Sequence, residues 1–109
     1  MKMLFAFVQN DDVKPLTREL IKCDISVTRI SSSGGFLSGG NSTLMIGVED
    51  DQLQTALKVI EQQSHKRTAA VPAPIFPTAQ VGDGNILPIN VTIGGATVFV
   101  IDVENLHKF

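Results

Sequence analysis

The sequence lacks tryptophan and tyrosine, has one cysteine and contains no long hydrophobic run. A single cysteine excludes an internal disulfide, and together with two histidines it cannot supply a Cys/His zinc cluster. The apolar run near the start covers only residues 3–8, which is too short for a secretory signal or a transmembrane helix. These absences favour a cytoplasmic protein in a reducing setting, with no membrane insertion and no metal site.

An excess of positive charge is also absent. Nine basic residues against eleven acidic ones give a net charge of −2. Long nucleic acids and anionic lipid surfaces are bound mainly through a positive field, so DNA and RNA are disfavoured as partners. The length of 109 residues and the 43% hydrophobic content fit one domain spanning residues 1–109.

The chain contains two similar halves with the same order of predicted elements. Alternating or continuous apolar residues predict strands, and apolar residues at helical spacing, such as Val13, Leu16 and Leu20, predict helices. The acidic residues around Asp12 and Asp51 are typical of helix starts, and Cys23 falls on the apolar stripe of the first helix as a core residue. The predicted strands are 3–8, 25–30, 42–48, 89–93 and 97–103, and the predicted helices are 13–23 and 51–63.

With the last two strands counted as one unit, the order β-α-β-β-α-β predicts an α+β, ferredoxin-like fold with two helices on one face of an antiparallel sheet. The opposite face of the sheet then has no helix on it, although residues 3–8 are apolar on both faces. Self-association is the simplest way to bury that second face. Residues 64–87 contain three prolines and no periodicity, which predicts a long flexible loop. Gly94-Gly95 makes the last two strands either one strand with a bulge or a hairpin.

The connection at residues 31–41 is a glycine-rich loop, S-S-S-G-G-F-L-S-G-G-N. Glycines at this density let backbone N–H groups face an anion, and an aromatic ring beside such donors suits a nucleobase joined to a phosphate. Phe36 and Leu37 lie between the glycine pairs and are the candidates for the base. The alternative is that both side chains pack against a neighbouring subunit while the glycines relax the hairpin.

Catalytic motifs are missing. Gly35 and Gly40 are followed by Asn41 rather than by the lysine of a P-loop, and no G-x-S-x-G nucleophile elbow occurs. His65 lies at a predicted helix end, which is typical of a solvated cation rather than a general base. We therefore expect no enzyme, no catalytic residue and no cofactor.

Four polar or small residues flank the glycine-rich loop. Thr28 and Arg29 end the strand before it, and Asn41 and Gly47 lie on the strand after it. They either converge across the hairpin on a ligand or are ordinary strand residues.

Several segments together resemble one family. They are V-T-R-I-S-S-S-G-G-F-L-S-G-G-N-S-T, G-V-E-D-D, V-T-I-G-G-A-T-V-F-V and the ending H-K-F. The sequence resembles the PII-like cyclic di-AMP receptor family over essentially the whole chain apart from residues 64–87. The resemblance implies a homotrimeric, non-enzymatic signal-transduction protein that binds this second messenger between subunits. Loop movement on binding would then regulate a downstream protein.

The resemblance also implies the ligand contacts, which fall on Thr28, Gly35, Phe36, Leu37, Asn41 and Gly47. Two positions depart from the family pattern: Ser26 stands where an arginine is common, and Lys108 stands where a glutamine is common. We expect Arg29 or Lys108 to supply a charged contact in compensation. The alternative is a PII-like trimeric adaptor that has lost cyclic di-AMP binding or binds another nucleotide.

Overall fold

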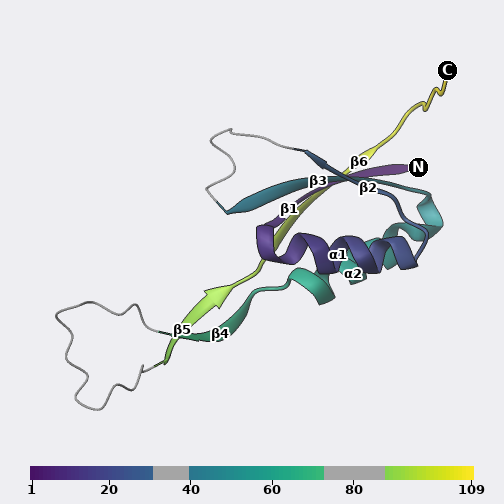
Figure 1. Cartoon of the computed structure of the whole chain (residues 1–109). Helices are drawn as coiled ribbons and strands as arrows, with labels where there is room; N and C mark the ends of the chain where they lie inside the picture. Colours follow the sequence, from purple (N-terminus) through teal and green to yellow (C-terminus); the bar gives the residue numbers. More distant parts are fainter. Residues whose placement is uncertain (31–39, 73–87) are drawn as a thin grey trace, which may run out of the picture.

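The computed structural model describes residues 1–30, 40–72 and 88–109. The elements follow one another as labelled in Figure 1. They are β1 (Lys2–Gln9), α1 (Asn10–Lys22), β2 (Val27–Ile30), β3 (Asn41–Val48), a 3₁₀ turn η1 (Asp50–Gln52), α2 (Leu53–Ser64), β4 (Arg67–Pro72), β5 (Pro88–Ile93) and β6 (Ala96–Asp102).

Four strands form one antiparallel sheet in the order β2-β3-β1-β6, with α1 and α2 together on one of its faces (Figure 1). The predicted α+β architecture, an antiparallel sheet with two helices, is confirmed. Strand β1 is central, as its apolar sequence predicts. No helix in the described ranges is long and apolar enough to cross a bilayer.

The hydrophobic core lies between the sheet and the two helices. Alternate residues of β1, Leu4, Ala6 and Val8, point toward the helices and are fully buried. They pack with the apolar stripes of α1 and α2 and with the same side of β3, which together exclude water from this face. The other buried core residues are Val13, Leu16, Leu20, Ile25, Leu44, Ile46, Val48, Ala56 and Ile60.

The opposite face of the sheet carries a second set of apolar side chains. Met3, Phe5 and Phe7 alternate with the core residues of β1 and are only partly buried. Phe5 is paired with Phe99 of β6, and the Phe7 and Phe99 rings meet edge to face at 5.8 Å. No helix of the described chain lies on this side (Figure 1), so the predicted uncovered face is confirmed for that part. We call this side the open face.

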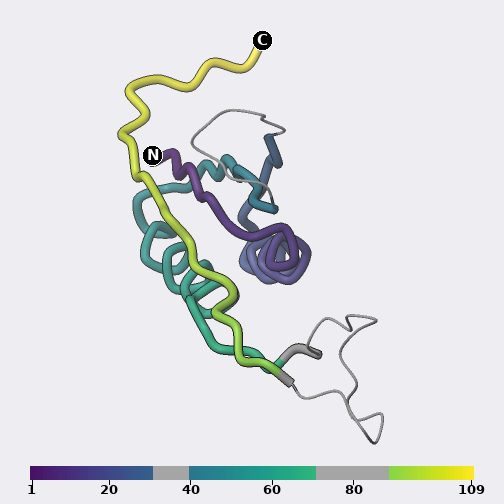
Figure 2. Tube along the Cα trace, turned by 90° about the vertical axis from the view of Figure 1, so that its left-hand side faces the viewer, coloured from purple at the N-terminus to yellow at the C-terminus, as the bar shows by residue number. Residues whose placement is uncertain are grey.

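Residues 67–72 correct the prediction of a continuous loop over 64–87. They form β4, which pairs with β5 in a separate two-stranded ribbon that projects from the body (Figure 2). The sequence R-T-A-A-V-P has few β-branched residues and no clear alternation, so its strand depends on pairing with β5 rather than on its own pattern. The rest of the predicted loop, 73–87, lies outside the described residues.

Gly94 and Gly95 separate the two sheets. Strand β5 pairs with β4 whereas β6 pairs with β1, so the last two strands form neither one continuous strand nor a hairpin with each other. Both glycines adopt the left-handed region, with φ of +78° and +100°. They turn the chain from the ribbon into the main sheet.

Cys23 is a second correction, because its side chain is exposed rather than in the core. Helix α1 ends at Lys22, and Asp24 adopts a φ of +61°, which turns the chain away from the helical path. The following residue, Ile25, fills the core in its place.

We predict that Gly94→Ala destabilises the fold more than Gly95→Ala. A Cβ at Gly94 would lie 2.5 Å from the His65 carbonyl oxygen, whereas at Gly95 it would meet nothing within 4 Å. Both changes incur about 1–2 kcal/mol for the left-handed backbone, and Gly94→Ala adds about 1–3 kcal/mol of steric strain. Urea unfolding at one protein concentration measures the difference. Equal losses would show that the close approach at Gly94 relaxes freely.

Candidate functional site

Three of the predicted ligand residues lie on the open face. Thr28 of β2 pairs with Met45 of β3. Because side chains alternate along a strand, Asn41, Met45 and Gly47 share this face, while Leu44 and its alternating neighbours point toward the helices. The open face therefore brings together Thr28, Asn41 and Gly47 on one side of the sheet.

These residues do not converge on one point within a single chain. Asn41 and Gly47 are six residues apart on β3, a separation of about 20 Å for an extended strand. Gly47 is paired with Met3 at one end of the sheet. Asn41 lies at the other end, directly after Gly40. A ligand that contacted both would have to extend along the strand.

Arg29 lies on the other side of the sheet from Thr28. Its guanidinium donates hydrogen bonds to Ser42 Oγ at 2.8 Å and to Asn10 Oδ1 at 3.4 Å. The Ser42 hydroxyl also donates to Asn10 Oδ1. The Asn10 backbone N–H in turn donates to the Gly40 carbonyl at 2.8 Å. Arg29 thus connects β2, β3 and the first turn of α1 at the end of the glycine-rich loop.

A small polar cavity adjoins this network. It has a volume of about 330 Å³ and is lined by Gln9, Asn10, Asp11, Gly40 and Asn41. Amide side chains can both donate and accept hydrogen bonds, so three amides and a carboxylate suit the polar edge of a ligand rather than an apolar group.

The remaining predicted site residues lie elsewhere. Lys108 is exposed in the C-terminal tail, which leaves the sheet after β6 and runs away from the body (Figures 1 and 2). Strand β6 ends beside Lys2, at the same end of the sheet as Gly47. Ser26 is exposed before β2. Gly35, Phe36 and Leu37 lie outside the described residues.

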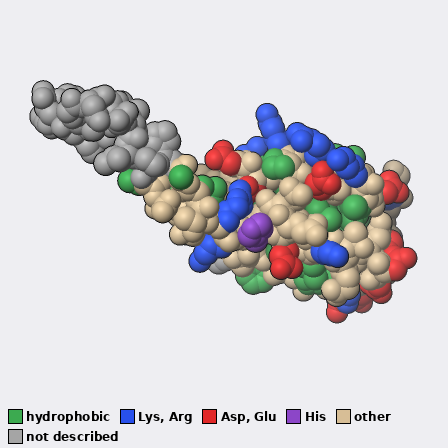
Figure 3. Space-filling model, turned by 90° about the horizontal axis from the view of Figure 1, so that it is seen from below, with side chains coloured by type: hydrophobic (Ala, Val, Ile, Leu, Met, Phe, Trp, Pro, Cys, Tyr) green, Lys and Arg blue, Asp and Glu red, His purple; other side chains and the backbone are tan. Residues whose placement is uncertain are grey.

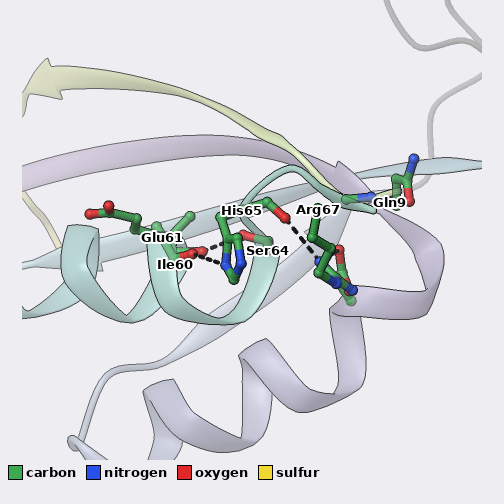
Figure 4. A network of polar contacts seen from close by, with 8 residues as sticks. Gln9, Ile60, Glu61, Ser64, His65 and Arg67 are labelled. Carbon is green, nitrogen blue, oxygen red and sulfur yellow. Dashed lines mark hydrogen bonds and ion pairs between the residues drawn. The ribbon is translucent and has the colours of Figure 1, made fainter. Parts of the chain in front are cut away.

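A cluster at the base of the ribbon, which we call the clasp, was not predicted from the sequence. Arg67 of β4 donates to Asp12 of α1 at 2.7 Å. It also donates to the His65 carbonyl at 3.0 Å (Figure 4). The hydrogen bond to Asp12 raises the pKa of Arg67. Gly94 donates to the Gln9 side chain at 2.7 Å. The clasp comprises these five residues and ties the ribbon to β1 and α1.

One sequence feature indicates the clasp in retrospect. Asp12, Leu16 and Leu20 are spaced four apart, so Asp12 lies on the buried face of α1, and its side chain is only 4% exposed. A carboxylate at such a position needs a cation or several donors. The sequence correctly predicts that Asp12 lies at the start of a helix, but it does not predict that Arg67 is its partner.

A sequence model described as cyclic-di-AMP receptor matches residues 1–109, the whole chain. The chain belongs to the cyclic-di-AMP receptor family. The resemblance stated from the sequence motifs is therefore confirmed, and with it membership of a family defined by a dinucleotide ligand.

A solved structure has a fold similar to that of this chain. The crystal structure of a functionally unknown protein from Pediococcus pentosaceus ATCC 25745 is 33% identical, with a TM-score of 0.77. The match covers 99% of this chain and 96% of the other. The α+β architecture of this chain is thus shared along nearly the full length of both proteins.

For the clasp, we predict that Arg67→Met destabilises the protein more than Asp12→Asn. Arg67→Met leaves a buried carboxylate without its cation, which costs about 3 kcal/mol. Asp12→Asn keeps an acceptor for the guanidinium, and the Arg67 side chain is 34% exposed and reaches water, so the loss is about 1–2 kcal/mol. Chemical denaturation at neutral pH measures both, and a larger loss for Asp12→Asn would contradict the burial argument.

Proposed function

We propose that this protein is a homotrimeric signal-transduction receptor, built from one PII-like domain per chain, that binds cyclic di-AMP between subunits. Binding changes the conformation of the loops that flank the site and so regulates a downstream protein. The receptor performs no catalysis and needs no cofactor. The observation that carries the proposal is the presence of Thr28, Asn41 and Gly47 on the open face, the side of the sheet that a second copy would cover.

The open face supports self-association. Phe99 and Ile101 of β6 are 47% and 48% exposed, and they adjoin the partly buried Met3 and Phe5. Contiguous exposed apolar side chains of this kind mark a protein interface. Three copies that present the same patch around a threefold axis would close the assembly and bury the face.

The proposed ligand contacts divide by chemistry. Asn41 would read the polar edge of an adenine, and Thr28 would hydrogen-bond the phosphate region. Phe36 and Leu37 would form an apolar wall for a base, and Gly35 and Gly47 would let the ligand approach the backbone. Lys108 would add a positive charge from the adjacent copy. A cyclic dinucleotide has two bases on one ring, which suits contacts distributed along β3.

Arg29 enters the proposal as a positioning residue. Its hydrogen bonds to Ser42 and Asn10 fix the start of β3, where Asn41 lies. Ser26 offers no guanidinium to the ligand. The phosphates are therefore held by Thr28, the loop backbone and Lys108 rather than by an arginine.

We predict that cyclic di-AMP binds in calorimetry and that Asn41→Ala weakens binding by about tenfold or more, because a hydrogen bond to the base is lost. Asn90→Ala, the same change on the exposed ribbon strand β5, is the matched control and should bind as the wild type does. A thermal-shift screen with ATP and AMP is done beside the calorimetry to test for other nucleotide ligands, since any ligand of the folded state raises the melting temperature. Stabilisation by one of these without cyclic di-AMP binding would favour the adaptor alternative.

For the assembly, we predict a mass in light scattering of three times the 11.7 kDa chain. Ile101→Glu should lower the mass toward one chain, because it introduces a charge into the open face. Ile21→Glu makes the same change at a position 61% exposed on the helix side and should leave the trimer intact. A wild-type mass of one chain would remove the intersubunit site.

A further inference from the structure

A groove on the helix side of the molecule is separate from the open face. It runs between α1 and the neighbouring part of β2 and has a volume of about 580 Å³. Strand β2 is at the edge of the main sheet, with β3 as its neighbour on one side. All the residues that line the groove belong to these two elements, so it is complete within one chain. We call it the α1/β2 groove.

One wall of the groove is basic. Lys14, Arg18 and Lys22 line it at intervals of four residues, which places them in one row along α1. Lys22 is paired with Glu19 at 3.0 Å. Within the described ranges, neither Lys14 nor Arg18 has a carboxylate at ion-pair distance. Seen from the helix side, Lys and Arg side chains gather along one edge of the molecule (Figure 3).

The positive charge is local, because the chain as a whole has a net charge of −2. Arg29, whose guanidinium also bonds to Ser42, lines the groove from β2 and adds a fourth cation. Four of the nine basic residues therefore border a single groove on an acidic protein. Such a concentration attracts a short acidic group and would steer its approach.

Apart from Thr17, the rest of the lining is apolar. The groove is bordered by Val13, Ile21 and Val27. Ile21 lies outside the core-facing stripe of α1, and its side chain is 61% exposed. A purely electrostatic site for phosphate would not need an exposed isoleucine. An apolar strip beside a basic row matches a peptide in which aliphatic and acidic residues alternate.

We propose that the α1/β2 groove binds an extended acidic segment of a partner protein. Aliphatic side chains of the segment lie on Ile21 and Val27, and its carboxylates face Lys14 and Arg18. The outer edge of β2 offers backbone hydrogen bonds to an extended chain. This groove would be the surface that binds the regulated protein of the proposed function. Only the identification of the partner as that regulated protein rests on the proposed function.

The test uses the full-length protein and a fluorescent ten-residue peptide in which glutamate and leucine alternate. Fluorescence anisotropy should show saturable binding that weakens as salt is added. Lys14→Glu/Arg18→Glu should weaken binding at least about tenfold, which corresponds to the loss of one charge-assisted contact or more. Lys58→Glu/Lys66→Glu, two exposed lysines of α2 and the following turn, is the matched control with the same charge change and should bind as the wild type does.

Two further measurements distinguish the contribution of the apolar residues from that of the basic row. Ile21→Ser should weaken binding of the alternating peptide. A decaglutamate peptide should bind the wild type less tightly than the alternating peptide does. No binding of the alternating peptide to the wild type, or equal binding to both charge-reversed variants, overturns the proposal. Tighter binding of a duplex DNA of equal charge, lost in Lys14→Glu/Arg18→Glu, also overturns it and assigns the groove to nucleic acid.

Calorimetry with cyclic di-AMP on the same variants distinguishes this proposal from the proposed function. Lys14 and Arg18 are outside the ligand residues, so the charge-reversed protein should bind cyclic di-AMP as the wild type does. Loss of peptide binding with retained dinucleotide binding supports the groove alone. Peptide binding by a protein that does not bind cyclic di-AMP would leave the groove in place and refute the receptor function.

Discussion

Strand β1 has apolar side chains on both faces, and the arrangement of the other elements follows from that. Leu4, Ala6 and Val8 need cover on one side, which α1 and α2 supply. Phe5 and Phe7 need cover on the other side, where the described chain supplies none beyond the edges of neighbouring strands. A sheet with this central strand has a complete core on one face and an unfinished one on the other.

The two faces also separate the two proposed activities. The open face carries Thr28, Asn41 and Gly47, so a dinucleotide there would lie at the proposed contact between copies of the chain. The helix side carries Lys14, Arg18 and Ile21 on a surface that assembly through the open face leaves accessible. The two proposed sites therefore use different surfaces, and a small molecule and a protein segment would not compete for either.

The sequence was sufficient to predict the central strand, both helices and the uncovered face, because each rests on periodicity within one segment. It did not predict β4, whose pairing with β5 depends on residues 16 to 26 positions away. Nor did it predict the Asp12 and Arg67 pair, since a contact between residues 55 apart leaves no local pattern. For the candidate site, the sequence alone did not show on which face of the sheet Thr28 and Asn41 lie. The strand register showed this, and it placed Arg29 on the opposite face.

The first turn of α1 holds two distant parts of the molecule. The backbone of Asn10 is bonded to Gly40, where the chain returns from the glycine-rich loop, and the carboxylate of Asp12 is bonded to Arg67, where the ribbon begins. Gly40 and Arg67 are therefore both bonded to the first turn of α1, through residues two positions apart. A displacement of this turn would shift both attachment points at once, so the start of β3 and the base of the ribbon would move together through α1.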